Sequence, residues 1–130
     1  MIDILLAEDN PADRYLIQEA FKQAAILCSV RTASNGGEAL ELIADGTWRP
    51  RLIILDLNLP RHDGLEVLQS VRAMKALADV PVVILTSSDS PEERDAALKL
   101  GATRFLRKPS ELDEFLHLGN VFQELLVQSE

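Results

Sequence analysis

The sequence is poor in cysteine and in aromatic side chains: Cys28 is the one cysteine, and aromatic residues make up 5% of the 130 positions. A single thiol cannot form a disulfide within the chain or a thiolate metal cluster, and it fits a reducing compartment. Long apolar runs are also missing, since none reaches the roughly 20 residues of a membrane-spanning helix. No basic, apolar leader precedes the first predicted strand. We therefore predict a cytoplasmic protein with no membrane partner.

Positive charge is scarce too, because 13 lysine and arginine residues face 21 aspartate and glutamate residues and leave a net charge of −8. Such a surface repels the phosphate backbone of DNA or RNA, so we predict no direct nucleic acid binding. A chain of 130 residues has room for one buried core, since single domains commonly have roughly 100 to 150 residues. We expect a single domain over residues 1–130, without a separate output domain.

Short apolar blocks alternate with amphipathic stretches about every 25 residues, which predicts five βα units. Continuous apolar runs such as Leu52 to Leu55 are typical of strands covered by helices on both faces. The pattern therefore predicts an α/β fold built on a parallel sheet. Strands are expected at 3–7, 28–33, 51–57, 80–86 and 103–107, and helices at 11–24, 36–45, 64–73, 91–100 and 111–127.

Most of the predicted helices carry capping signals. Asn10 can accept a hydrogen bond from the free amides of the first turn, and Pro11 is pre-set for the first helical position. Gly46 and Gly101 stand where the second and fourth helices should end in a left-handed residue. Three further starts follow the capping-box pattern: Ser90 with Glu93, Asp63 with Glu66, and Ser110 with Asp113.

Residues that suit phosphoryl chemistry follow four of the predicted strands. Glu8 and Asp9 follow the first strand, Asp56 follows the third strand's apolar run, Thr86 ends the fourth strand, and Lys108 follows the fifth. The carboxyl ends of parallel strands lie along one edge of a sheet, so we expect these segments to converge there. The lysine and the threonine hydroxyl can then each bond one oxygen of a phosphoryl group on the aspartate.

Three of these residues are acids, and their charges need a partner. Carboxylates from Glu8, Asp9 and Asp56 repel one another in one crevice unless a proton or a cation joins them. Oxygen ligands of this kind suit Mg²⁺, and the backbone carbonyl of Asn58, in the turn after Asp56, can supply another. The residues therefore predict a magnesium-dependent phosphoacceptor site.

Five ordered motifs carry these residues: Glu8-Asp9-Asn10-Pro11, Leu55-Asp56-Leu57-Asn58-Leu59-Pro60, Asp63-Gly64, Leu85-Thr86-Ser87-Ser88 and Lys108-Pro109-Ser110. Together they resemble the receiver domains of two-component response regulators. Asp56 lies 30 residues before Thr86 and 52 residues before Lys108, and both separations match that family. The resemblance covers nearly the whole chain. A narrower similarity, to the small regulators that work beside phytochrome-like sensor kinases, rests on the first and last motifs.

The resemblance implies a flavodoxin-like (βα)5 doubly wound sandwich with strand order 2-1-3-4-5. It implies a stand-alone response regulator in a phosphorelay, whose Asp56 accepts a phosphoryl group from a sensor histidine kinase or phosphotransfer protein. Mg²⁺ would be held by Glu8, Asp9, Asp56 and the Asn58 carbonyl. The chain would be a signalling switch and not an enzyme, apart from catalysing its own phosphorylation and dephosphorylation.

The resemblance also gives roles to the residues around the phosphoryl group. Lys108 would pair with it, and Thr86, followed by Ser87, would move toward it. The peptide bond before Pro109 is expected to be cis, which would aim the lysine into the crevice.

Four further positions complete the expected site. Phe105 would rotate inward as the threonine moves, and because it lacks a phenolic hydroxyl, the switch would depend on packing. Asn58 and Ser88 would tune the rate of dephosphorylation. Glu8 stands where many relatives have aspartate, and a water-bridged metal contact tolerates the extra methylene.

The last predicted helix carries more apolar surface than one core stripe needs. At about 100° per residue, one face holds Leu112, Phe115, Leu116, Gly119, Phe122 and Leu126. A second stripe holds Leu118, Val121 and Leu125. It favours a homodimer or partner contact through helix 91–100, strand 103–107 and helix 111–127, the surface expected to change on phosphorylation. A wide core face is the alternative interpretation.

Three other functions remain open at this point. A phosphatase of the haloacid dehalogenase type also uses a strand-end aspartate, Mg²⁺, a hydroxyl and a lysine, but it has an acid where this chain has Asn58. A flavodoxin-like binding module would need a loop rich in glycine and hydroxyl groups after the first strand, where this chain has acids. A receiver that no longer takes phosphate would serve only as a docking domain.

Overall fold

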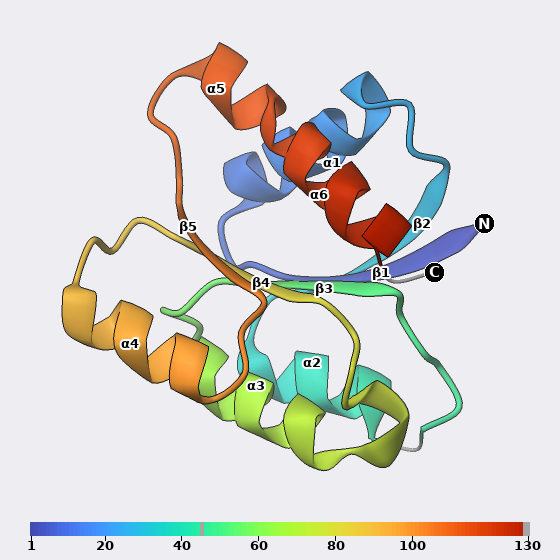
Figure 1. Ribbon diagram of the computed structural model, residues 1–130, viewed down its shortest axis with the longest axis vertical. Coiled ribbons are helices and arrows are strands. Elements are labelled where there is room, and N and C mark those ends of the chain that lie inside the picture. Colours follow the sequence, from blue (N-terminus) through green and yellow to red (C-terminus); the bar gives the residue numbers. More distant parts are fainter. Residues whose placement is uncertain (45, 129–130) are drawn as a thin grey trace.

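The computed structural model describes residues 1–44 and 46–128 and confirms the predicted α/β architecture (Figure 1). Its sheet is parallel and has the strand order β2-β1-β3-β4-β5, as predicted. The strands are β1 (Ile2–Ala7), β2 (Cys28–Ala33), β3 (Leu52–Leu55), β4 (Val82–Thr86) and β5 (Arg104–Arg107). Each lies inside its predicted range, except that β1 begins one residue earlier.

Helices cover both faces of the sheet (Figure 1). One face carries α1 (Pro11–Gln23), α5 (Leu112–Leu116) and α6 (Leu118–Gln128). The other carries α2 (Gly36–Ile43), α3 (Gly64–Ala73) and α4 (Pro91–Lys99), with a short 3-10 helix, η1 (Lys75–Leu77), after α3. Among the described residues, none of these helices combines the length and the apolar character that spanning a membrane requires.

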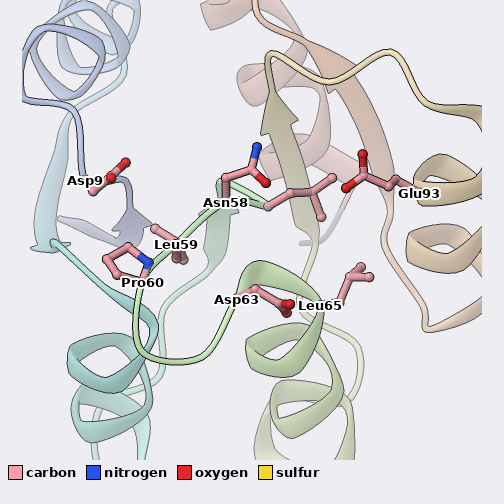
Figure 2. Close-up of a pocket in the computed structure, with 8 residues that line it drawn as sticks. Asp9, Asn58, Leu59, Pro60, Asp63, Leu65 and Glu93 are labelled. Carbon is pink, nitrogen blue, oxygen red and sulfur yellow. The ribbon is translucent and has the colours of Figure 1, made fainter.

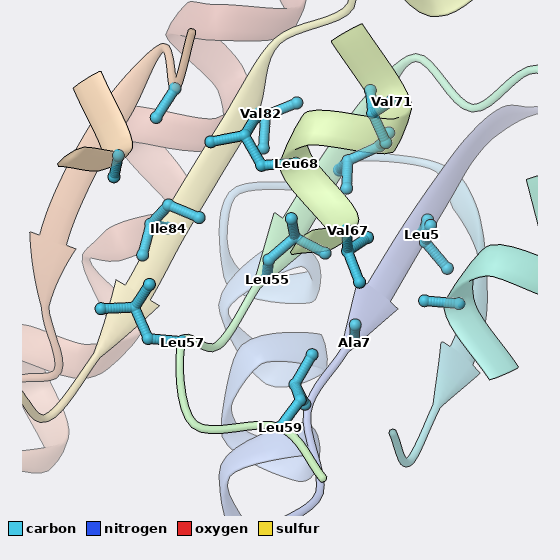
Figure 3. Close-up of a cluster of buried hydrophobic side chains, with 14 of the residues drawn as sticks. Leu5, Ala7, Leu55, Leu57, Leu59, Val67, Leu68, Val71, Val82 and Ile84 are labelled. Carbon is cyan, nitrogen blue, oxygen red and sulfur yellow. The ribbon is translucent and has the colours of Figure 1, made fainter. Parts of the chain in front are cut away.

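The strands divide the core into two layers because successive side chains point to opposite faces. Leu5, Leu55 and Ile84 face α2, α3 and α4, and Figure 3 shows them packed around Val67 and Leu68 of α3. The alternate residues of the same strands face the other three helices: Ile4, Leu6, Leu52, Ile54, Val83 and Leu85. Both sides are buried, which explains why β3 and β4 are continuously apolar.

The predicted caps of three helices are present. The Asn10 side chain accepts hydrogen bonds from two amides of α1, Asp63 caps α3 and Ser90 caps α4. Gly46 and Gly101 have φ of 72° and 106°, the left-handed conformation expected of them. Residue 45, the predicted end of the second helix, lies outside the described residues.

The prediction of one continuous helix at 111–127 is wrong. The segment forms two helices separated at His117. The N-cap of α5 is Glu111, which makes no side-chain cap hydrogen bond, so the predicted cap from Ser110 is absent. After the break, α6 packs closely on α1. A Cβ on Gly119 would lie 2.3 Å from the Ala20 carbonyl oxygen, so the two backbones meet there.

The burial of α6 side chains overturns the predicted interface stripe. Leu118 and Leu125 are 7% and 3% exposed and belong to the core between α1, α6 and the sheet. Val121 is partly buried against the same cluster. Leu112, predicted as core, is 57% exposed. The apolar residues that suggested a homodimer are therefore a wide core face.

Candidate functional site

The strand register brings the acidic residues together at the carboxyl edge of the sheet. Ala7 pairs with Leu55, so the next residues on β1 and β3, Glu8 and Asp56, are neighbours. The Asp56 amide donates to the Ala7 carbonyl at 3.0 Å. An arginine at the start of α1, Arg14, donates to the Glu8 carbonyl at 2.7 Å and ties the helix to this edge.

The three predicted metal-binding carboxylates form one cluster. Glu8, Asp9 and Asp56 each offer an oxygen, and these oxygens lie within 4.8 Å of one another. Glu8 and Asp56 are 1% and 6% exposed, whereas Asp9 is exposed. Carboxylate oxygens at this spacing, open to water on one side, fit a magnesium ion that keeps several waters.

Lys108 extends its ammonium group into this cluster. Its Nζ lies 2.7 Å from Glu8 Oε1 and 3.0 Å from Asp56 Oδ2. A third carboxylate, Asp13 Oδ2, lies at 2.8 Å. The lysine is placed by β5, because its amide donates to the Thr86 carbonyl at 2.6 Å. The structure thus unites the predicted lysine with the predicted phosphoacceptor.

Sequence reasoning missed Asp13. Its signal was available: Asn10 and Pro11 mark a helix start, and an acid three residues after the cap lies in the first turn of that helix. Because the first turn of α1 follows Glu8 and Asp9 directly, this acid could only lie near the same edge of the sheet.

Burial and charge oppose each other at this site. Burial, together with the nearby charge of Asp56, raises the pKa of Glu8 to about 7, although hydrogen bonds from Lys108 and the Asn10 amide act in the other direction. Burial alone would lower the pKa of Lys108, but its bonds to Asp13, Glu8 and Asp56 outweigh that effect and raise it. The lysine is a firmly held cation in an environment with surplus negative charge.

The residues after β4 form a hydrogen-bonded turn beside the cluster. Thr86 is fully buried, and its Oγ1 accepts a hydrogen bond from the Ser88 amide at 3.2 Å. The Ser88 hydroxyl donates to Glu93 in the first turn of α4. Ser87, between them, is exposed. This turn links the end of β4 directly to α4.

The loop after Asp56 borders a cavity of about 440 Å³ (Figure 2). Asn58 donates its amide to Asp56 Oδ1 at 3.2 Å, and its exposed side chain lines the cavity with Asp9 and Glu93. Further along the loop, Arg61 and His62 adopt φ of 50° and 77°, which is costly for residues other than glycine. The cavity therefore lies beside the acidic cluster, with Asp9 of that cluster in its wall.

The same loop is held by the start of α2. The Gly36 amide donates to the Pro60 carbonyl at 3.0 Å, and a Cβ on Gly36 would lie 1.8 Å from the His62 carbonyl oxygen. Only glycine allows this contact. The loop that carries the Asn58 carbonyl is therefore shaped by α2 as well as by β3.

Phe105 lies on β5, where the predicted switch residue should be, whereas the peptide bond before Pro109 differs from its prediction. Phe105 is 7% exposed and points into the core, and its carbonyl accepts a hydrogen bond from Arg94 of α4 at 3.2 Å. The peptide before Pro109 is trans, since no described residue has a cis peptide bond, so the cis prediction is wrong. Pairing with Thr86 already carries Lys108 to the crevice, and the trans form is intrinsically favoured.

The fold and the site together define a doubly wound α/β protein with an acidic, lysine-containing pocket at the carboxyl edge of its sheet. The family model of the response regulator receiver domain matches residues 4–119. The chain belongs to this family. The membership confirms the resemblance found in the motifs, and it favours a receiver over a phosphatase or a flavin-binding module.

Two response regulators illustrate the similarity in sequence. MprA of Mycobacterium sp. (strain KMS) is 39% identical over 115 residues, which cover 88% of this chain and 47% of that protein. Rcp1 of Synechocystis sp. (strain ATCC 27184 / PCC 6803 / Kazusa) is 34% identical over 120 residues, which cover 88% of this chain and 82% of Rcp1. The chain spans about half the length of the MprA proteins that it matches.

Two solved structures extend the similarity to the fold. The phosphorylated cyanobacterial phytochrome response regulator RcpA superimposes with a TM-score of 0.89 at 31% identity, covering 99% of this chain and 96% of that one. The Mn²⁺-bound form of Rcp1 superimposes with a TM-score of 0.86 at 32% identity, covering 95% of this chain and 93% of that one. The flavodoxin-like fold of the family is the fold of this chain.

Proposed function

We propose that this receiver domain is phosphorylated on Asp56 in a magnesium-dependent reaction and works in a phosphorelay. The contact between Lys108 and Asp56, 3.0 Å long and set among clustered carboxylates, is the observation that carries the proposal. A phosphoryl group on Asp56 would bring oxygens with negative charge to the position that the ammonium group already faces.

In the proposed reaction, an Asp56 carboxylate oxygen attacks the phosphorus of a phosphohistidine on a sensor kinase or phosphotransfer protein. The new bond joins oxygen to phosphorus, the phosphorus–nitrogen bond breaks, and its electron pair returns to the imidazole. The aspartate loses no proton, so a general base is not required. The product is an acyl phosphate on Asp56 and a free histidine.

Side chains around Asp56 stabilise the charge that moves in this reaction. Lys108 bonds one phosphoryl oxygen, and the Thr86 hydroxyl bonds another once its side chain turns from the Ser88 amide. Glu8, Asp9, Asp56 and the Asn58 carbonyl are the oxygen donors that would hold Mg²⁺. When bound, the ion neutralises phosphoryl charge that these acids would otherwise repel.

The signal would leave through α4, β5 and α5. Thr86 and Ser88 connect the pocket to α4 through Glu93, and Arg94 of the same helix connects α4 to the Phe105 carbonyl. Movement of Thr86 toward the phosphoryl group would change the first of these links. Phe105 would follow by repacking, because it has no hydroxyl to exchange hydrogen bonds.

The proposed partner is a sensor histidine kinase or a phosphotransfer protein, and the proposed location is the cytoplasm. RcpA, which superimposes closely, is a phytochrome response regulator, and this similarity supports a kinase of the phytochrome type. The test is phosphoryl transfer from such a kinase after it has been phosphorylated with labelled ATP. The domain should take up the label from this kinase within seconds. It should take up no label from an unrelated histidine kinase.

Intact mass after incubation with acetyl phosphate and Mg²⁺ tests the central step. The wild type should gain one phosphate mass, Asp56→Asn should gain none, and chelation of Mg²⁺ should suppress the gain. Asp79→Asn, an exposed substitution at the opposite edge of the sheet, is the control and should behave as wild type. A gain in both the wild type and Asp56→Asn, or in neither, contradicts the assignment.

The same reaction separates a receiver from a phosphatase. A receiver consumes one acetyl phosphate per chain quickly and then releases inorganic phosphate only at its slow dephosphorylation rate. A phosphatase would hydrolyse many phosphate esters per chain, including esters that leave no stable phosphoprotein.

A further inference from the structure

Asp13 is the one carboxylate on Lys108 that stands apart from the proposed metal ligands. Lys108 Nζ contacts three acids, Glu8 at 2.7 Å, Asp13 at 2.8 Å and Asp56 at 3.0 Å. Two of these acids belong to the cluster whose oxygens lie within 4.8 Å of one another, and Asp13 does not. The ammonium group has three N–H donors, and each has a carboxylate here.

The place of Asp13 is fixed independently of that cluster. It is the third residue of α1, and its backbone amide donates to the Asn10 side chain at 3.2 Å. Its side chain is 22% exposed and that of Lys108 is 13% exposed, so water screens their ion pair only partly. A capped helix start therefore presents this carboxylate to the lysine from a rigid element.

We propose that Asp13 is a positioning residue that holds the Lys108 ammonium group over Asp56 during phosphoryl transfer. The inference rests on the proposed function of Asp56. When the oxygens of Glu8 and Asp56 engage a cation and a phosphoryl group, those two acids no longer restrain the lysine. Asp13 then accepts a hydrogen bond from one N–H of the Lys108 ammonium group, and the other two N–H groups are free to bond the phosphoryl oxygens.

This role makes a prediction about the lysine itself, in protein saturated with Mg²⁺ but without a phosphoryl donor, where the ion would engage Glu8 and Asp56 and leave Asp13 to hold the ammonium group. The chain has four lysines, so ¹³Cε relaxation in lysine-labelled protein can follow each one, with Lys108 assigned by its loss in Lys108→Met. In the wild type the Lys108 methylene should be restrained, whereas that of Lys22, 74% exposed, should be mobile. Asp13→Ala should increase the mobility of Lys108 alone.

Rates of phosphorylation by acetyl phosphate at saturating Mg²⁺ give the second measurement. Loss of a charged hydrogen bond to the lysine should slow Asp13→Ala and Asp13→Asn by roughly tenfold. Asp13→Glu, which keeps the carboxylate, should recover most of the rate. Glu19→Gln removes one charge from the exposed part of the same helix and should leave both the rate and the Lys108 signal unchanged.

These measurements separate the possible failures. If the wild type takes no phosphate while Asp13→Ala still frees Lys108, the proposed function fails and the contact stands. If the wild type is phosphorylated and Asp13→Asn, shown to be folded by its circular dichroism, keeps both its rate and a restrained Lys108, the positioning role is wrong. A faster rate in Asp13→Asn also overturns it, since Asp13 would then compete with the phosphoryl group.

Discussion

The two edges of the sheet each hold a partly buried cation, but the two cations have different partners. At the amino edge, Arg72 of α3 donates to backbone carbonyls of Val80 at 2.7 Å, Gly101 at 2.9 Å and Leu77 at 3.2 Å. One cation there joins the end of α3 to the entries of β4 and β5. At the carboxyl edge, one cation, Lys108, is shared by three carboxylates, and a fourth lies beside them.

The difference lies in what the cations bind. Arg72 satisfies neutral carbonyls, so its bonds add no negative charge, and burial lowers its pKa while Asp79 raises it. Lys108 faces more negative charge than it can neutralise, and part of that charge is buried. The amino edge should therefore contribute stability, and the carboxyl edge should gain stability only when a further cation binds. Four experiments test this contrast.

Substitution of Arg72 by alanine should have the largest effect on stability. It leaves several backbone carbonyls at the amino edge without their donor, at a cost of about 4 kcal/mol in the free energy of unfolding. Urea denaturation measures the loss, and Arg72→Lys should recover only part of it. Folded Arg72→Lys should still be phosphorylated at the wild-type rate, because the amino edge lies away from the reaction. If Arg72→Ala lowers the free energy of unfolding by less than about 1 kcal/mol, the hydrogen bonds of Arg72 do not stabilise this edge as proposed.

Glu8 should make the metal-free protein less stable as pH rises. Its pKa is about 7 in the folded protein against an ordinary 4.5, so the folded state disfavours the ionised form. The penalty is absent below about pH 4.5, grows up to about pH 7 and is complete above it, reaching at most about 3 kcal/mol. Glu8→Gln, which cannot ionise, should therefore be more stable than the wild type at pH 8 and nearly equal to it at pH 4.5. Denaturation at both pH values with a chelator present checks this; a constant difference contradicts the buried-charge explanation.

Any side chain at Gly36, the first residue of α2, should destabilise the loop at the carboxyl edge that packs against it. A methyl group there would overlap the His62 carbonyl oxygen, so Gly36→Ala should destabilise the protein by about 2 kcal/mol and disturb the nearby loop. Gly37→Ala is the matched control, because its Cβ would meet the flexible Arg61 guanidinium at 3.1 Å. Thermal melts of the two variants should differ clearly. Equal melting temperatures would mean that the loop moves aside freely.

Binding of Mg²⁺ should give the smallest shift. At a concentration ten times its dissociation constant, an ion that binds only the folded state adds about 1.4 kcal/mol. The shift should vanish in Asp9→Asn and persist in Arg72→Lys, because among the described residues only the carboxyl edge brings three acidic side chains close enough to hold one ion. Thermal melts across a Mg²⁺ titration provide the measurement. An equal shift in Asp9→Asn would place the ion elsewhere.

Much of the fold and of the carboxyl edge was predictable from local sequence. The continuous apolar runs of β3 and β4 indicate a sheet covered on both faces, and Asn10, Asp63 and Ser90 mark helix starts because a side-chain cap needs only its own turn. The strand-end positions of Asp56 and Lys108 predict their meeting, since parallel strands share one edge.

Features that depend on packing between distant segments were not predictable in this way. The close contact of Gly119 with Ala20, almost one hundred residues earlier, cannot be found in the periodicity of α6. The burial of Leu118 and Leu125 likewise depends on how α6 packs against α1 and the sheet. The capped start of α1 already places Asp13 near the carboxyl edge, but its 2.8 Å contact with Lys108 depends on how the complete fold sets α1 beside the residue that follows β5.

That pairing spans 95 residues of the chain, from the first helix to the end of the last strand. During synthesis, a ribosome therefore releases Asp56 long before the lysine that completes its surroundings. A nascent or truncated chain that has not yet added β5 lacks the ammonium group that pairs with Glu8 and Asp56. The buried acids therefore meet their cation only when the final strand is in place.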